Sequence, residues 1–318
     1  MTYIEQPILL TGAAGFIGSN LLRKLIKKKY LVHIIISKNS DLWRIKELKN
    51  KFILHHTDLE NEKEIEKIIK KIKPKTIFHL AAHGAYSFQK NIKRIKKVNF
   101  DSTINLVENC KLYGFSKFIN TGSSSEYGFR NNKMSEIDLV TPNSDYATFK
   151  SAASIYCQYQ ALYNKLPIVT LRPFHVYGPY EDRKRLIPTL LNYLANNLNP
   201  KLVSPKISRD LIYIDDVIDI YIMTCNNSRA NGEIINLASG KNTPLKKIFS
   251  VIKKETKSKV KPIWNSMEKR DWDQEYWVAD IQKLKKIYTN KKLISFDLGI
   301  KKFYSWYKKN KKYYNVNS

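Results

Sequence analysis

The chain has 318 residues, enough for one large domain or two smaller ones. Hydrophobic residues make up 43% of it, so it can bury a substantial core, which excludes a wholly disordered chain. The formal net charge is +28, from 56 Lys and Arg against 28 Asp and Glu. The three Cys residues lack CxxC spacing, so the sequence predicts a reduced, cytoplasmic protein with no disulfide framework and no metal site.

The charge is compatible with a nucleic-acid or membrane partner. However, the basic residues are 46 Lys and only 10 Arg, whereas recognition of bases and phosphates favours Arg. The Lys residues are spread along the chain, so we interpret them as a solvated surface and predict no nucleic-acid partner. No apolar run approaches the roughly 18 residues that span a bilayer, and residues 1–6 do not resemble a signal peptide, so no membrane partner is predicted.

Strand-like and helix-like segments alternate through the first half. A short apolar run at residues 7–11 is followed by glycines and then by a helical pattern over 16–28. Further strands are predicted at 31–36, 52–55, 76–81, 117–121 and 168–172, and further helices at 60–71, 102–113 and 145–163. This alternation predicts an α/β, Rossmann-like fold with a doubly wound parallel sheet.

After residue 173 the pattern becomes a mixture of short strands, helices and loops. We therefore predict a smaller C-terminal α/β lobe that binds substrate. The dinucleotide-binding domain is predicted at 1–172 with a return segment at about 211–238, and the lobe at 173–210 and 239–318.

A glycine-rich turn at residues 11–18 follows the first strand and opens the first helix. Small residues let a pyrophosphate approach the backbone, and the helix start supplies free N–H groups. Glycines also occur in a purely structural turn, but the strand before and the helix after favour cofactor binding. The predicted contacts are Gly12, Gly15, Phe16, Ile17 and Gly18.

The end of the second strand carries no acidic residue that would hold a ribose 2′-hydroxyl and repel a 2′-phosphate. The nearest carboxylate, Asp41, comes several residues later. Ser37 and Lys38, with Ser40 and Arg44 beyond them, could accept a phosphate instead. The sequence therefore favours NADP(H) as the cofactor, with NAD(H) possible.

Two later strand ends complete the predicted cofactor site. Asp58 and Leu59 follow the third strand and are predicted to flank the adenine, although Asp58 could instead cap the next helix. Ala81 and Ala82 end the fourth strand, where small side chains let a cofactor lie close.

A Tyr-x-x-x-Lys pair places a phenol and an ammonium one helical turn apart, where the Lys charge can lower the pKa of the Tyr. The motif occurs seven times: at Tyr86, Tyr113, Tyr146, Tyr180, Tyr288, Tyr304 and Tyr307. Only Tyr146 and Lys150 begin a long helix soon after the fifth predicted strand, at the edge where parallel sheets bind ligands. Just upstream, residues 123–125 supply three hydroxyl groups.

Five segments in this order resemble the extended short-chain dehydrogenases/reductases of the NAD(P)-dependent nucleotide-sugar epimerase/dehydratase family. They are Gly12-x-x-Gly15-x-x-Gly18, Ser-Ser-Ser-Glu-Tyr-Gly at 123–128, Tyr146-Ala-Thr-Phe-Lys150, Leu-Arg-Pro-Phe-His-Val-Tyr-Gly-Pro at 171–179 and Arg-Asp-Leu-Ile-Tyr-Ile-Asp-Asp at 209–216. The resemblance implies Ser123 as catalytic hydroxyl, Tyr146 as acid/base and Lys150 as the ribose-holding ammonium.

The same resemblance implies a nucleotide-diphosphate sugar as ligand, Phe174 as a further cofactor contact, and a homodimer formed by the helices at 102–113 and 145–163. The residues implied on the sugar side are His83, Tyr86, Ser124, His175, Arg209, Tyr213 and Arg270. For His83 the alternative is loop packing, and for His175 it is a structural contact beside the cofactor.

Family members that eliminate water carry Asp and then Glu directly after the catalytic hydroxyl, whereas this chain has Ser124 and Ser125, and Glu126 comes one place late. We therefore do not expect a sugar 4,6-dehydratase, because the acid/base pair for elimination is missing. The reactions that remain are those that transfer a hydride without eliminating water.

The spelling of residues 39–44, 79–86 and 120–128 is similar to that of CDP-abequose and CDP-paratose synthase-type 4-ketoreductases. The predicted function is NADPH-dependent reduction of the C4 carbonyl of a nucleotide-linked 4-keto-6-deoxy sugar. The alternatives are a nucleotide-sugar 4-epimerase that holds NAD and, outside enzymes, an inactive dinucleotide-binding module.

Overall fold

The computed structural model describes residues 3–86, 88–268, 274–289 and 291–314. Its centre is a seven-stranded parallel sheet with the strand order β10-β6-β5-β4-β1-β2-β3. The strands are β1 (Ile8–Thr11), β2 (Val32–Ile36), β3 (Ile53–His56), β4 (Thr76–His79), β5 (Lys117–Thr121), β6 (Ile168–Pro173) and β10 (Ile234–Leu237). The predicted α/β, Rossmann-like fold is confirmed.

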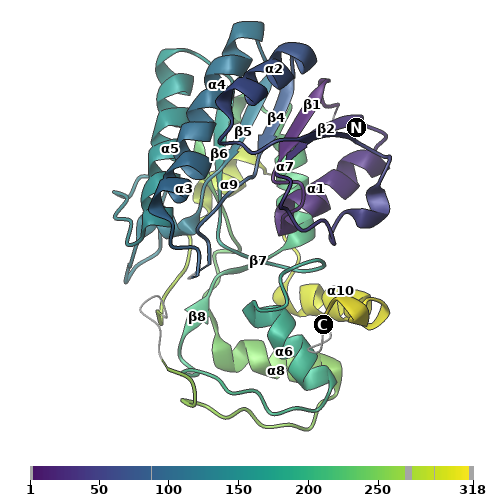
Figure 1. Cartoon of the computed structure of the whole chain (residues 1–318). Coiled ribbons are helices and arrows are strands. Elements are labelled where there is room, and N and C mark those ends of the chain that lie inside the picture. The colour runs from purple at the N-terminus through teal and green to yellow at the C-terminus, as the bar shows by residue number, and fades with distance from the viewer. Residues whose placement is uncertain (1–2, 87, 269–273, 290, 315–318) are drawn as a thin grey trace.

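Helices cover both faces of this sheet (Figure 1). One face carries α1 (Phe16–Lys27) and α7 (Ile214–Thr224), and the other carries α2 (Glu62–Ile72), α4 (Ser102–Tyr113) and α5 (Asp145–Tyr163). Side chains alternate between the faces, so Leu10 packs in the core beneath α1, whereas its neighbour Leu9 packs in the core beneath α2. Burial on both faces explains why the strands read as continuous apolar runs.

Helix boundaries agree with the sequence where local signals are strong. The helices predicted at 102–113 and 145–163 are observed with those bounds as α4 and α5. The helix predicted at 60–71 begins two residues later, at Glu62, because the Asn61 side chain accepts the N–H of Glu64 and acts as the N-cap. This corrects the alternative that Asp58 caps α2. A short helix, α3 (Ile92–Lys96), and a π-helical turn, η2 (Lys97–Asp101), lead into α4 and were not predicted.

The second half of the chain returns to the sheet once. After β6 the chain passes through β7 (His175–Tyr177), α6 (Leu186–Ala195), β8 (Ser208–Arg209) and β9 (Leu211–Tyr213), and then α7 covers the sheet and β10 pairs with β6. This path runs through the predicted return segment, whose boundaries stay a prediction.

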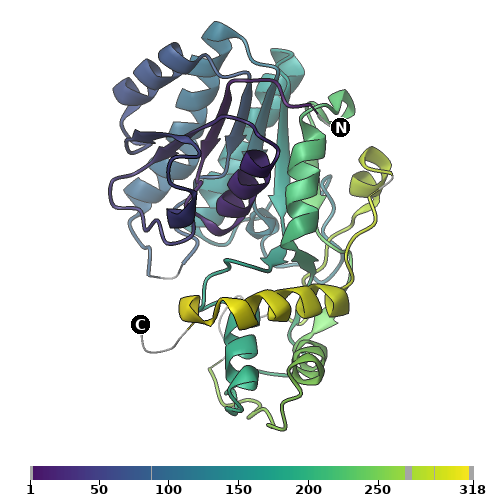
Figure 2. The same ribbon diagram turned by 90° about the vertical axis from the view of Figure 1, so that its right-hand side faces the viewer.

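The smaller lobe lies beyond the end of β6, below the sheet in Figures 1 and 2, where α10 crosses beneath α7. It contains α6 (Leu186–Ala195), α8 (Leu245–Thr256), α10 (Phe296–Lys309), a parallel pair of β7 (His175–Tyr177) and β9 (Leu211–Tyr213), and an antiparallel pair of β8 (Ser208–Arg209) and β11 (Thr243–Pro244). The helix α9 (Gln282–Ile287) packs beside β10. The short helical turns are η1 (Lys46–Leu48), η3 (Ser124–Tyr127), η4 (Ser228–Ala230) and η5 (Lys311–Tyr313). Among the described helices, none combines the length and the apolar composition that a membrane-crossing segment needs.

Candidate active site

The glycine loop joins β1 to α1 and leaves no room for side chains. Gly12 has φ +72°, and a Cβ atom there would lie 2.6 Å from the backbone N of Ala81. A Cβ atom on Gly18 would overlap the carbonyl oxygen of Gly12. Gly15 is the N-cap of α1, so no side chain covers the N–H groups of the first turn. This cradle fits a dinucleotide pyrophosphate, because the backbone is bare and the helix start is positively polarised.

A buried hydrogen-bonded chain holds the loop from below. Thr11 Oγ1 lies 2.8 Å from His79 Nδ1, and His79 Nε2 lies 3.0 Å from Thr103 Oγ1. Thr11 Oγ1 also accepts the N–H of Ala81 at 3.3 Å. Burial, together with the nearby charge of Lys150, lowers the pKa of His79 to about 3, so the ring is neutral. The residue before Gly12 is therefore fixed to both β4 and α4.

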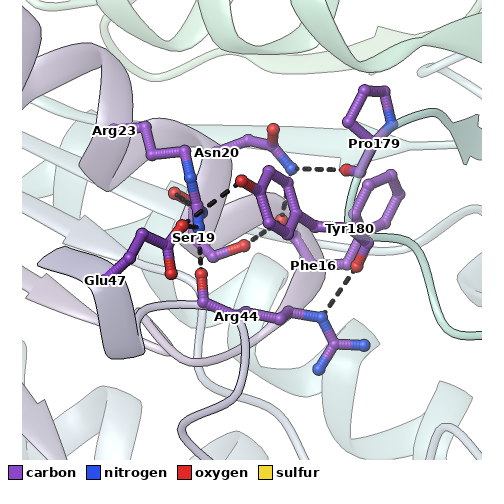
Figure 3. Close-up of polar contacts among 8 residues, drawn as sticks. All are labelled: Phe16, Ser19, Asn20, Arg23, Arg44, Glu47, Pro179 and Tyr180. Carbon is purple, nitrogen blue, oxygen red and sulfur yellow. Dashed lines mark hydrogen bonds and ion pairs between the residues drawn. The ribbon is translucent and has the colours of Figure 1, made fainter. Parts of the chain in front are cut away.

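At the end of β2, Lys38 is exposed and Ser37 is partly exposed. Arg44, which was expected to accept a phosphate, contacts backbone carbonyl groups instead. Its Nε donates to the carbonyl of Tyr180 at 2.8 Å (Figure 3). Its Nη1 lies 3.5 Å from the carbonyl oxygen of Ala14. Arg44 thus joins the glycine loop to the segment after β7, while Ser37 and Lys38 stay at the strand end.

Helix α1 holds the same segment (Figure 3). Asn20 Nδ2 donates to the carbonyl of Pro179 at 3.0 Å. Arg23 forms an ion pair with Glu47, and its guanidinium carbon lies 3.6 Å from the ring centre of Tyr180. The loop after β2, helix α1 and the segment after β7 therefore form one connected surface around the glycine loop.

Asp58 lies beside an open groove near α2. Its carboxylate forms an ion pair with Arg94 at 3.2 Å and accepts the N–H of Glu60 at 3.2 Å. The groove is lined by Asn39, Asp58, Glu60, Asn61, Glu62, Lys63, Arg94 and Lys97. Leu59 is buried against the core, whereas Ala82, at the end of the β4 segment, is exposed.

Ser123, Tyr146 and Lys150 come together where β5 ends and α5 begins. Ser123 is the N-cap of η3, Tyr146 lies in the first turn of α5, and Lys150 lies one turn later with 2% of its surface exposed. Burial raises the pKa of Tyr146, and its hydrogen bond with Ser123 lowers it in part. The net direction is upward, which corrects the expectation of a Tyr pKa lowered by Lys150. Burial lowers the pKa of Lys150 itself.

The neighbouring serines are engaged with protein groups. Ser124 Oγ accepts the indole N–H of Trp277 at 3.3 Å, and Ser125 Oγ lies 2.8 Å from Ser123 Oγ. Glu126 is turned inward and pairs with Arg172 at 2.7 Å. The two positions after the catalytic hydroxyl therefore hold hydroxyl groups, and the nearby carboxylate is committed to a buried ion pair.

Two residues expected on the sugar side come from the loop after β4. His83 Nδ1 lies 3.2 Å from the amide nitrogen of Gln89, and burial and the charge of Arg94 lower the pKa of His83. The Tyr86 hydroxyl donates to Asp182 at 2.9 Å. His83 thus lies on the side of the groove near α2, and Tyr86 bridges to the segment after β7.

Two more of the residues expected on the sugar side lie in the smaller lobe. The His175 ring meets Trp277 edge-on, with ring centres 6.2 Å apart. Burial lowers the pKa of His175 well below its usual value, and the charges of Arg209 and Arg185 lower it further. Arg209 Nη1 donates to the carbonyl of Ser208 at 2.8 Å, which directs the guanidinium along β8.

Tyr213 was expected in the cleft, but it lies in the core. Only 3% of it is exposed, and its ring centre lies 5.4 Å from that of Tyr177. Phe174 is also buried, and its ring centre lies 6.2 Å from that of Tyr127. The role of Phe174 as a cofactor contact stays a prediction. Arg270 lies outside the described residues.

Arg185 was missed by the sequence analysis. Its guanidinium carbon lies 4.6 Å from the ring centre of Tyr86, and its charge lowers the pKa of Tyr146. Sequence reasoning did not single out Arg185, although Arg is rare in this chain and could have marked it.

Glu126 was also missed as a partner of Ser123. The spacing Ser-x-x-Glu at residues 123–126 is that of a capping box, and the structure contains the capping box. This signal was available in the sequence.

Comparisons with known proteins find relatives that modify nucleotide sugars. The chain is 31% identical over 239 residues to a dTDP-D-glucose 4,6-dehydratase of Dictyostelium discoideum, which covers 68% of this chain and 54% of that protein. It is 29% identical over 315 residues to a UDP-glucuronate 4-epimerase of Thermodesulfobacterium geofontis, covering 95% and 96% of the two chains. It is 26% identical over 280 residues to a CDP-abequose synthase of Salmonella muenchen, covering 85% and 88%.

A solved structure shares the fold over nearly the whole length. The UDP-glucuronic acid 4-epimerase of Bacillus cereus, in complex with UDP-glucuronic acid and NAD, superposes with a TM-score of 0.82 at 26% identity, covering 95% of this chain and 99% of that one. The model of the NAD dependent epimerase/dehydratase family matches residues 8–238, which include the glycine loop, Ser123, Tyr146 and Lys150. The chain belongs to the NAD dependent epimerase/dehydratase family.

Proposed function

We propose that this protein is an NADPH-dependent reductase of the C4 carbonyl of a nucleotide-linked 4-keto-6-deoxy sugar. The observation that carries the proposal is that Ser123, Tyr146 and Lys150 come together where β5 ends and α5 begins, with hydroxyl groups at Ser124 and Ser125 where elimination would need carboxylates. The relatedness to a CDP-abequose synthase supports the same reaction class.

In this reaction, Tyr146 donates its phenolic proton to the carbonyl oxygen of the sugar. The Ser123 hydroxyl donates a hydrogen bond to the same oxygen as negative charge develops on it. Lys150, one helical turn after Tyr146, would hold the ribose of the dinucleotide and supply positive charge close to the phenol. The hydride comes from the nicotinamide ring of the dinucleotide when it is bound.

The residues that would hold the dinucleotide are distributed along the strand ends. The backbone at Gly12, Gly15, Phe16, Ile17 and Gly18 would bind the pyrophosphate. Ser37 and Lys38 would contact the 2′-phosphate, Asp58 and Leu59 the adenine, and Ala81, Ala82 and Phe174 the remaining faces of the cofactor. Competitive binding of the two dinucleotides tests this preference, and tighter binding of NAD(H) than of NADP(H) would contradict it.

The residues that would hold the nucleotide sugar lie on both sides of Tyr146. Tyr86 and Ser124 come from the larger domain, and His175 and Arg209 from β7 and β8. Arg209 suits a diphosphate, because a guanidinium presents several donors to phosphate oxygens.

A second candidate is a nucleotide-sugar 4-epimerase with resident NAD. It is favoured by the 4-epimerase relative that matches 95% of the chain. The protein as purified separates the two: an epimerase interconverts its sugars without added cofactor, whereas a reductase consumes NADPH in a one-to-one ratio with product.

The decisive variant is Tyr146→Phe. We expect its kcat to fall by about 10²- to 10⁴-fold because the proton donor is lost, while NADPH binding is retained. The matched control is Tyr304→Phe, which removes the hydroxyl from another Tyr-x-x-x-Lys pair, on α10. NADPH absorbance with a panel of nucleotide-linked 4-keto sugars gives the rates, and full activity of Tyr146→Phe would refute the assignment.

A further inference from the structure

A buried acidic side chain lies beside the main chain of Ser123. Glu126 has no exposed surface, and its Oε2 atom accepts a hydrogen bond from Arg172 Nη2 at 2.7 Å. Arg172, on β6, is 2% exposed, and its guanidinium carbon lies 4.4 Å from the ring centre of Tyr127. The Tyr127 hydroxyl in turn donates to Asn236 on β10 at 2.8 Å. The carboxylate is therefore anchored to two neighbouring strands of the sheet.

The other carboxylate oxygen reaches Ser123. Glu126 Oε1 accepts the backbone N–H of Ser123 at 2.6 Å, and the N–H of Glu126 donates to the carbonyl of Ser123 at 3.1 Å. The Ser123 hydroxyl lies 2.8 Å from Ser125 Oγ, and hydrogen bonding from Ser123 lowers the pKa of Tyr146 in part. The main chain of Ser123 is thus fixed from the interior, while its side chain interacts with the phenol.

The residue before Ser123 is shaped to admit this carboxylate. A Cβ atom on Gly122 would lie 2.6 Å from Glu126 Oε1. Gly122 does not have a positive φ, so its small size rather than its backbone freedom is what the site uses. The bare α-carbon leaves space for the oxygen that holds Ser123.

We infer that Glu126 is a positioning residue, which, with Arg172 as its anchor, holds the Ser123 hydroxyl in line with Tyr146 for the reaction. This inference rests on the proposed function. A misplacement of about 1 Å at a reacting centre can cost about 100-fold in rate, so a rigid support beneath Ser123 has a measurable effect. A buried ion pair contributes little net stability compared with apolar residues of similar volume, which leaves positioning as the reason for its presence.

The test replaces the whole pair, because a single replacement would leave a buried charge without its partner. In E126M/R172M both side chains become apolar and the acceptor for the Ser123 N–H is lost. In E126Q/R172M the amide oxygen keeps that acceptor. We expect kcat to fall at least tenfold in the first variant and to recover most of this loss in the second, with KM and the Kd for NADPH within threefold of the wild type in both.

A cycle with Ser123→Ala shows whether the effect passes through Ser123. In the Ser123→Ala background, the Met and Gln variants should have equal kcat, because the hydroxyl that Glu126 positions is gone. Crystal structures of the two double variants give a readout without turnover: the distance between Ser123 Oγ and Tyr146 Oη should lengthen in E126M/R172M only.

Two further variants keep the test decisive. Gly122→Ala displaces the carboxylate by its own Cβ atom while leaving Glu126 and Arg172 present, and should reproduce the loss in kcat even where E126M/R172M does not fold. Glu136→Gln is the control, since Glu136 is another carboxylate that accepts a backbone N–H, from Asn236 at 2.8 Å. It should keep wild-type kcat.

Equal kcat in E126M/R172M and E126Q/R172M would overturn the inference, as would the same ratio between them in the Ser123→Ala background. Full activity in Gly122→Ala would do so as well. A wild-type protein that consumes no NADPH with any 4-keto sugar, or an active Tyr146→Phe variant, would instead overturn the proposed function. The distance between Ser123 Oγ and Tyr146 Oη then still decides the role of Glu126.

Discussion

In the proposed reduction, Tyr146 must carry its phenolic proton, and the environment of its side chain determines up to which pH it does so. Burial raises the pKa of Tyr146, and the hydrogen bond with Ser123 lowers it in part. For a reduction that needs the protonated phenol, activity is therefore present at neutral pH and is lost as pH rises through the Tyr146 pKa.

Ser123→Ala should move this alkaline loss of activity to higher pH. The replacement removes the hydrogen bond that lowers the Tyr146 pKa, so the phenol stays protonated over a wider range, although kcat itself falls by about 10²- to 10³-fold. The pH profile of the residual kcat measures the effect, with Thr148→Ala on the exposed face of α5 as the control. An unchanged or lower alkaline limb would contradict it.

His79 makes stability depend on pH through a buried ring that takes no part in the proposed proton transfer. Its pKa is about 3 in the folded protein and near 6.5 in an unfolded chain, because the ring is buried between Thr11 and Thr103. A folded-state pKa below the unfolded value means that the unfolded chain binds the proton first. Stability from this residue is therefore full above pH 6.5 and declines as pH falls toward 3.

We expect this decline to cost about 2 kcal/mol of unfolding free energy between pH 7.5 and pH 5. Urea unfolding at the two pH values measures it. His79→Asn should reduce the difference between them, whatever its own stability, whereas His56→Asn, at an exposed position on β3, should leave the difference as in the wild type. Equal pH dependence in the wild type and His79→Asn would exclude this source.

The places of Ser123, Tyr146 and Lys150 at the ends of one strand and one helix were predictable from the sequence, but the environments of these side chains were not. Position along the chain selected Tyr146 and Lys150 from seven equivalent pairs, because only that pair follows a central strand and opens a long helix. The upward direction of the Tyr146 pKa depends on burial, which a linear motif does not encode. The burial of Tyr213 likewise comes from contact with Tyr177, on a strand 34 residues earlier.

At the scale of elements, the glycine loop and α1 act as one unit. Gly18 packs against the carbonyl of Gly12, so backbone lies where a side chain would be. Gly18→Ala should push the helix away from the loop, lowering the unfolding free energy by about 1–3 kcal/mol, as overpacking does. It should also weaken dinucleotide binding by at least about tenfold, because the N–H groups of the first turn move.

Gly114→Ala is the matched control. Gly114 has φ +65°, so alanine is strained there and stability also falls, but nothing lies within 4 Å of an added Cβ atom and the residue is remote from the loop. Thermal unfolding and fluorescence titration with both dinucleotides compare the variants. If both variants lost affinity for the dinucleotides, or if neither did, the two glycines would be equivalent for binding. Gly18 would then have no specific role in holding the dinucleotide.

Regular elements were predictable because their signals are local. Apart from the edge strand β3, the strands of the central sheet are runs of four to six largely buried residues, and β5 is observed with its predicted bounds. The helix α3 and the π-helical turn after it escaped prediction, since Ile92–Lys96 spans barely more than one turn and is rich in lysine. The two-residue strands β8 and β11 exist only through their pairing with each other.

At the scale of the whole molecule, the net charge of +28 has a smaller meaning than its size suggests. The cations that the candidate site uses are few: Lys150 beneath Tyr146, Arg44 beside the glycine loop, and Arg185 and Arg209 near His175. Cations at such a site suit the ligands of this family, because dinucleotides and nucleotide sugars are small molecules that carry phosphates.

The surface of α4 and α5 carries the clearest whole-molecule prediction. Ile155, Tyr159, Leu162 and Tyr163 are 56%, 49%, 50% and 76% exposed and follow one another at helical spacing along α5. Leu112 on α4, on the same side of the sheet (Figure 1), is 74% exposed. An apolar stripe of this kind on a folded protein marks an interaction surface. We therefore predict a homodimer in which α4 and α5 of two copies pack together.

In a two-fold interface each substitution appears twice, so two negative charges on α5 bring four into contact. Ile155→Asp combined with Leu162→Asp should convert the dimer to a monomer at tens of micromolar, measured by size-exclusion chromatography with light scattering. Ile137→Asp is the control, because Ile137 is 88% exposed on a loop outside these helices, and it should leave the dimer intact. A monomeric wild-type protein would contradict the predicted homodimer. A dimer that persists in the double variant would show that the interface lies elsewhere than on α5.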